Sequence, residues 1–153
     1  VEIIFKNQYL LARKERHNFM NKKDIWRYKS LEQLENKTWG TATEQDSGLI
    51  QKCLALVKIP VVKLSASELR VLIGQSFNPA YLVPSALEIL QNDVLVTAGM
   101  YSGDLLKTVL DVPAFFWEEH PDLHKSLIDM MQERSEEIET EIDLPEFWRK
   151  AEA

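Results

Sequence analysis

Residues 65–92 read SASELRVLIGQSFNPAYLVPSALEILQN, and this stretch decides the fold class. Ser65 and Glu68 have the spacing of a capping box, so a helix is predicted to begin here. Apolar residues then recur on one face at helical spacing: Leu69, Leu72 and Ile73. Gly74 falls inside that pattern, where a glycine costs about 1 kcal/mol relative to alanine. We expect Gly74 to let another backbone approach closely.

The second half of this stretch predicts another helix. Asn78-Pro79 ends the first one, and the next is expected over residues 81–92, with Pro84 tolerated in its first turn. Its inward-facing positions are Val83, Ala86, Leu87 and Leu90. Two helices joined by a short link indicate a helical bundle.

Similar patterns extend outward in both directions. Ser30 and Gln33 predict a short helix before Trp39-Gly40, and Asp46 or Ser47 is expected to cap another. The latter carries a wide apolar stripe: Leu49, Ile50, Cys53, Leu54 and Val57. Further helices are expected from Ser102-Gly103-Asp104, after Pro113 and, as the longest, over residues 121–141. The aromatic residues Phe147 and Trp148 are expected to pack back onto the body.

Strand patterns are almost absent from the sequence. Residues 61–64, VVKL, are the best strand candidate, and residues 2–5, EIIF, read equally well as a short strand or as part of an N-terminal helix. The sequence therefore predicts a compact all-α bundle of six or seven helices, in which residues 1–153 form a single domain.

Charge is divided between the two ends of the chain. Residues 1–63 hold 12 Lys and Arg against 7 Asp and Glu, a net charge of +5, whereas residues 64–153 hold 6 against 17, a net charge of −11. An acidic surface repels phosphate, so direct nucleic-acid binding is not expected. It instead suits docking onto a cationic protein.

The cysteine content and the length of the apolar stretches indicate the cellular compartment in which the protein is expected. Cys53 is the one cysteine, so no intramolecular disulfide can form, which suits a reducing compartment such as the cytoplasm. Its place on an apolar stripe predicts a core residue. No apolar stretch approaches the roughly 18 residues that a bilayer span needs, so no membrane association is expected.

Two groups of polar residues have spacings that are compatible with metal binding or catalysis. His120 and His124 are four apart, as zinc ligands on a helix can be, but Pro121 between them places His120 at a helix start. Glu118, Glu119 and Asp122 form a dense carboxylate patch that suits a solvated surface, a docking site for a basic partner or, least well, acid–base catalysis. The sequence predicts no metal site, no cofactor and no catalytic residue.

Several segments, in order, resemble a known family. They are Ser30–Glu35 with Trp39, Glu68–Gln75, Tyr81–Pro84 with Ala86-Leu87, Tyr101 with Gly103–Leu106, Val109-Leu110, Val112-Pro113, and Phe116-Trp117 with His120-Pro121. Together, over about residues 30–127, they resemble the helical immunity proteins of bacterial contact-dependent growth inhibition (CDI) systems.

This resemblance implies a cytoplasmic antitoxin without enzymatic activity. It would bind, one to one, the C-terminal toxin domain of a cognate CdiA effector, frequently a nuclease such as a tRNA nuclease, and block the toxin's active site or substrate surface. Whether a host protein joins the complex stays open.

The family supplies no catalytic residues to carry over, so the toxin-contacting residues are predicted from helix starts and loops. They are Tyr101, Asp104, Asp111, Trp117, Glu118, Glu119 and Asp122. Two other functions remain as alternatives: a small metal-dependent hydrolase that uses Glu118, Glu119, His120 and His124, and a helical protein–protein adaptor.

Overall fold

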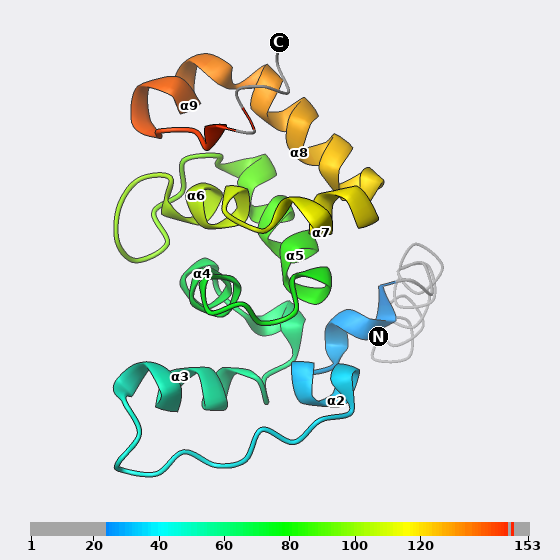
Figure 1. Cartoon of the computed structure of the whole chain (residues 1–153), viewed down its shortest axis with the longest axis vertical. Coiled ribbons are helices and arrows are strands. Elements are labelled where there is room, and N and C mark those ends of the chain that lie inside the picture. Colours follow the sequence, from blue (N-terminus) through cyan, green and yellow to red (C-terminus); the bar gives the residue numbers. More distant parts are fainter. Residues whose placement is uncertain (1–23, 147, 149–153) are drawn as a thin grey trace, which may run out of the picture.

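A computed structural model describes residues 24–146 and 148 of the 153-residue chain. Over these residues the protein is all-α, as predicted, and contains no strand (Figure 1). Its elements are η1 (Ile25–Tyr28), α2 (Leu31–Glu35), α3 (Gly48–Leu56), η2 (Val61–Lys63), α4 (Ala66–Gly74), α5 (Pro79–Asn92), α6 (Asp104–Leu110), α7 (Ala114–Glu119), α8 (Pro121–Glu133) and α9 (Ser135–Glu141). Here η marks a 3-10 helix.

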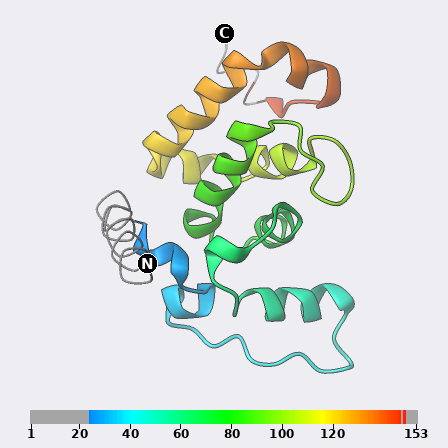
Figure 2. The same cartoon turned by 180° about the vertical axis from the view of Figure 1, so that it is seen from behind.

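Helices α4, α5 and α6 pack against one another at the centre of the fold. Helix α3 packs on α4, α8 packs on α5, and α7 and α9 pack on α8. Helices α2 and α3 therefore lie toward one end of the long axis and α8 and α9 toward the other (Figure 1). The view from behind shows α5 connecting the two ends (Figure 2). The buried apolar residues form one continuous cluster that reaches from Leu31 to Trp148.

The helix starts follow the local sequence signals. Both predicted capping boxes form: the hydroxyl of Ser30 accepts from Gln33 N–H at 3.3 Å, and that of Ser65 accepts from Glu68 N–H at 3.2 Å. Ser47 caps α3 by accepting from the N–H of Ile50 at 3.2 Å. Each cap satisfies a donor that the helix itself leaves unpaired.

Two expected elements differ from the sequence reading. The strand candidate at residues 61–64 is the 3-10 helix η2, because a tight turn places Val61 and Leu64 in the core together. The expected helix over residues 121–141 is broken at Arg134, whose φ and ψ are −123° and 26°. The Arg134 guanidinium donates to the carbonyls of Leu90 and Gln91 at the end of α5, at 3.3 and 2.5 Å, and this contact fixes the bend between α8 and α9.

The expected apolar stripe of α3 is only partly buried. Cys53 and Val57 lie in the core, and burial raises the pKa of the Cys53 thiol, which agrees with its predicted core position. Leu49 and Ile50, however, are exposed. The reason is that these two residues belong to the first turn of α3, whereas the buried residues of the helix, Cys53 and Leu56, lie in its second half.

The predictions for the two ends of the chain have different outcomes. The predicted N-terminal helix and the strand candidate at residues 2–5 lie outside the described residues, as does Phe147. Trp148 packs back onto the body as expected: its indole is buried and its Nε1–H donates to the carbonyl of Leu110 at 3.1 Å.

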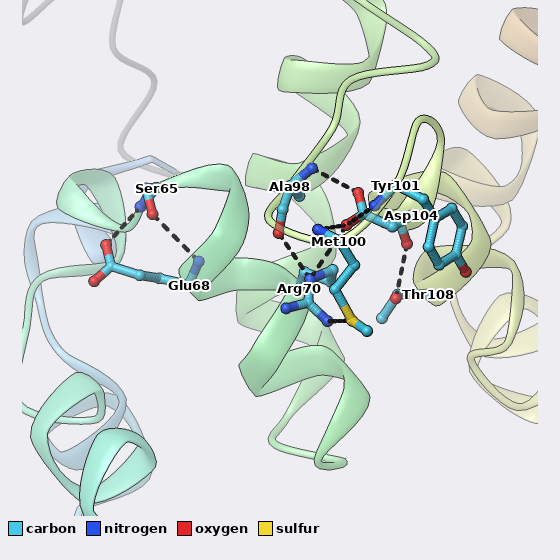
Figure 3. A network of polar contacts seen from close by, with 8 residues as sticks. All are labelled: Ser65, Glu68, Arg70, Ala98, Met100, Tyr101, Asp104 and Thr108. Carbon is cyan, nitrogen blue, oxygen red and sulfur yellow. Dashed lines mark hydrogen bonds and ion pairs between the residues drawn. The ribbon is translucent and has the colours of Figure 1, made fainter. Parts of the chain in front are cut away.

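A buried carboxylate organises the link between α5 and α6 (Figure 3). The side chain of Asp104 is 2% exposed and accepts from three backbone N–H groups, those of Ala98 at 2.6 Å, Met100 at 2.9 Å and Tyr101 at 3.4 Å. Arg70 of α4 places its Nε 3.6 Å from the same carboxylate and donates to the carbonyl of Ala98 at 2.8 Å. These contacts tie residues 98–101 to both α4 and α6.

The charge state of Asp104 follows from two opposing effects. Burial acts to raise the pKa of the Asp104 carboxyl, but the hydrogen bonds from Ala98, Met100 and Tyr101, together with Arg70, outweigh it and leave that pKa below its ordinary value of 3.8. Asp104 is therefore ionised at neutral pH, and its negative charge is compensated inside the protein.

Position 103, directly before Asp104, requires glycine because of its backbone conformation. Its φ is +83°, and a Cβ there would lie 2.7 Å from Cδ1 of Ile142. Gly74 differs from expectation: it ends α4, it is exposed, and a Cβ would meet only Cγ2 of Thr108 at 3.8 Å. No backbone approaches it closely, so the predicted role of Gly74 is wrong.

We predict that Asp104→Asn lowers the free energy of unfolding by about 2–4 kcal/mol at pH 7, because an amide presents a donor to backbone N–H groups and leaves Arg70 without its charge partner. The native pKa lies below the unfolded one, so this stabilisation is complete above the unfolded-state pKa and is lost as the pH falls through the native pKa. Urea unfolding from pH 7 down to about pH 2 should show the two proteins converging. A difference that stays constant over that range would contradict the assignment.

We also predict that Gly103→Ala destabilises the protein by about 1–3 kcal/mol, because alanine is strained at this φ and its methyl group meets Ile142. Gly74→Ala is the matched control, and it should leave stability unchanged or raise it by up to about 1 kcal/mol. Thermal unfolding of both variants measures the contrast, and equal losses at the two positions would argue against it.

Candidate functional site

The seven residues predicted to contact a toxin divide into two groups. Five are exposed: Tyr101, Asp111, Glu118, Glu119 and Asp122. The other two, Asp104 and Trp117, are buried. The exposed members come from the loop before α6, the end of α6, the end of α7 and the start of α8.

The buried pair needs a correction. The Asp104 carboxylate is occupied by backbone donors and faces inward, so it positions the neighbouring loop and presents no surface. Trp117 packs edge-on against Phe116, with ring centroids 5.1 Å apart, and against Trp148 at 5.9 Å. Both residues therefore support the surface from below, and neither is retained as a direct contact.

Phe115 is an exposed aromatic residue that sequence reasoning missed. It is 63% exposed on α7, and Glu118 and Glu119 follow at i+3 and i+4 on the same side of that helix. The signal was present in the run Phe115-Phe116-Trp117. Three consecutive bulky side chains on a short helix point in different directions, so one of them must face solvent.

A groove of about 390 Å³ opens beside Phe115. Its lining comes from the end of α4, the link to α5, the link between α6 and α7, and the first turn of α7, and includes Phe77, Val112, Pro113, Phe115 and Phe116. Asp111 lies at its edge and pairs with Lys107 at 3.1 Å. We call the exposed residues Tyr101, Asp111, Phe115, Glu118 and Glu119, with this groove, the α6–α7 face.

This face and the start of α8 are strongly acidic. Residues 108–124 contain four carboxylates, Asp111, Glu118, Glu119 and Asp122, and no Lys or Arg. The flanking lysines are engaged, since Lys107 pairs with Asp111 and Lys125 pairs with Asp129 at 2.6 Å. Glu118, Glu119 and Asp122 are all exposed, so no apolar environment distinguishes one of them as a catalytic acid or base would require.

The two histidines considered as zinc ligands are packed against aromatic rings. His120 stacks on Phe116, with centroids 4.3 Å apart, and its Nδ1–H donates to the Phe116 carbonyl at 2.9 Å. His124 lies 5.5 Å from the ring of Trp148 and 6.0 Å from that of Trp117. Within the described part of the chain, no group of three or more His, Cys, Asp or Glu residues is arranged to hold a metal.

None of the described helices is long and apolar enough to cross a bilayer. The acidic face and the apolar groove together have the composition of a docking surface, with an exposed aromatic residue beside charged groups.

Comparisons with known proteins agree with this character. The model of a family described as CDI immunity proteins, CdiI_3, matches residues 33–127, which include the whole α6–α7 face. Neither the curated proteins nor the solved structures that were searched contain a match to the chain. Because the family model covers more than half of the sequence, the chain belongs to the CDI immunity protein family.

Proposed function

We propose that this protein neutralises a cognate CdiA C-terminal toxin domain by binding it one to one through the α6–α7 face, and that the toxin is a nuclease. An immunity role follows from the family. The observation that supports the finer proposal is the run of exposed carboxylates on residues 108–124, which carry no Lys or Arg. A nuclease must present cationic side chains to phosphate, and carboxylates can occupy those positions in its place.

The proposed role sets a size for the interface. A specific complex buries about 800 Å² on each partner. The proposed face comprises the groove and exposed residues from the loop before α6 to the end of α7, and α6 itself spans about 10 Å. Long-range attraction between opposite charges would accelerate encounter, and Phe115 with its groove would slow dissociation.

The proposed mechanism needs no turnover by this chain. Occupation of the toxin's active site or its substrate surface is sufficient, and it would take place in the cytoplasm, where the toxin meets its substrate. The immunity protein itself then contributes shape, charge and apolar area.

Growth rescue tests the proposed function. Expression of the toxin domain encoded immediately upstream should stop growth, and co-expression of this chain should restore it. The purified pair should form a 1:1 complex by calorimetry. Continued growth arrest despite expression of soluble protein, or no heat of binding, would contradict the proposal.

The face itself is tested by charge reversal. Glu118→Lys with Glu119→Lys should weaken toxin binding about tenfold to a hundredfold at low salt, mainly through slower association, without steepening the salt dependence. The control reverses two exposed glutamates elsewhere, Glu44→Lys with Glu133→Lys, and so changes the net charge equally. An affinity that is unchanged in the first variant, or lowered equally in both, would remove these two glutamates from the interface.

A further inference from the structure

Two adjacent bulky side chains stand out from the surface on the loop before α6. Met100 is 69% exposed and Tyr101 is 51% exposed. They form the tip of a turn that a single bridge between Thr97 and Ser102 closes. We call this pair the Met100–Tyr101 tip. Exposed apolar area is unfavourable in water, and contiguous exposed apolar area is typical of binding surfaces.

The backbone beneath the tip is held from several sides (Figure 3). Asp104 accepts from the N–H groups of both tip residues, and on the far side the Gly103 N–H and the Ser102 hydroxyl donate to the carbonyl of Leu95 at 3.0 and 3.1 Å. Ordering a loop costs conformational entropy. Here the loop is already ordered in the free protein, so little further conformational entropy is lost when a partner binds.

The Met100–Tyr101 tip has a firmly held backbone but exposed side chains. A buried carboxylate is costly unless it is fully hydrogen-bonded, and Asp104 meets that cost with bonds to a loop whose side chains point outward. The side chain of Met100 has one polar neighbour, an Arg70 nitrogen 3.4 Å from its sulfur, and still remains mostly in solvent. Methionine and tyrosine are enriched at the centres of protein interfaces, and rigidly held aromatic residues there often dominate affinity.

The charges around the tip indicate the kind of partner. Arg70 and Lys107, the cations of α4 and α6, pair with Asp104 and Asp111. On the other side, Ile142 lies close to Gly103 and brings the end of α9 beside the loop. Helix α9 carries four exposed glutamates and no Lys or Arg: Glu136, Glu137, Glu139 and Glu141. An apolar tip beside a helix whose charged residues are all glutamates complements an apolar pocket with a cationic rim.

We propose that the Met100–Tyr101 tip is the apolar anchor of the complex and that it inserts into a pocket of the toxin domain bordered by Lys or Arg side chains. This inference rests on the proposed function. It adds Met100 to the interface at the start of α6. The tip, together with Phe115 and its groove, then sets the rate of dissociation, and the glutamates set the rate of encounter.

The test measures association and dissociation rates of the purified toxin domain with the full-length protein. Met100→Ala and Tyr101→Ala should each weaken affinity about tenfold to a hundredfold, through faster dissociation and with an unchanged salt dependence. Tyr28→Ala is the matched control, since Tyr28 is 54% exposed on η1, and it should bind within about twofold of the wild type.

The outcomes separate the two proposals. Wild-type protein that binds while both tip variants bind equally well would overturn the anchor and leave the immunity function standing. Wild-type protein that does not bind the toxin domain at all would overturn the proposed function and the anchor with it. Loss of affinity in Tyr28→Ala as large as that in Tyr101→Ala would also overturn the assignment, because exposure alone would then explain the effect.

A further variant tests the support beneath the tip. Asp104→Asn keeps both anchor side chains but loosens the loop, so at a temperature where the variant is folded it should associate several-fold more slowly, because fewer molecules hold the competent loop. Amide exchange at Met100 and Tyr101 in the free variant should be faster in parallel. If Asp104→Asn associates as fast as the wild type although its amides at Met100 and Tyr101 exchange faster, the tip does not need to be held in place, and the role assigned to Asp104 in binding would be contradicted.

Discussion

The ionised carboxylate of Asp104 is the constraint on which the rest of this surface depends. Its burial is tolerable only because three backbone N–H groups and Arg70 compensate it. The same contacts join α4, α6 and the loop between α5 and α6. Gly103, with its positive φ and its close approach to Ile142, completes this junction. The positions of the exposed residues Met100 and Tyr101, whose N–H groups donate to Asp104, follow from it.

Features decided by neighbours in sequence could be predicted from the chain alone. The capping boxes at Ser30 and Ser65 and the helix class of the fold are of this kind, because their signals lie within a few residues. The bend at Arg134 could not be predicted, since its cause is a contact with carbonyls more than 40 positions away. The exposure of Leu49 and Ile50 likewise depends on tertiary packing, because the core covers only the second half of α3.

The candidate site shows the same division. Acidic character and the exposed positions of Glu118, Glu119 and Asp122 follow from composition and helix starts. Asp104 and Trp117 were expected on the surface because a polar residue and an aromatic residue near helix starts suit an interface. Instead, the Asp104 carboxylate accepts from backbone N–H groups of the loop that folds back over it, and Trp117 packs against Trp148. Both side chains are buried beneath the candidate surface. Phe115 was missed because only the packing decides which of three adjacent aromatic residues faces solvent.

The central claim is that a rigid, acidic surface built around α6 receives a cationic toxin. Amide hydrogen exchange of this protein, with and without the toxin domain, tests that claim most directly. The account predicts that residues 98–104 exchange slowly in the free protein and that residues 99–103 and 114–119 become more protected in the complex, while α2 and α3 are unchanged. New protection confined to α2 and α3, with none at residues 99–119, would contradict it.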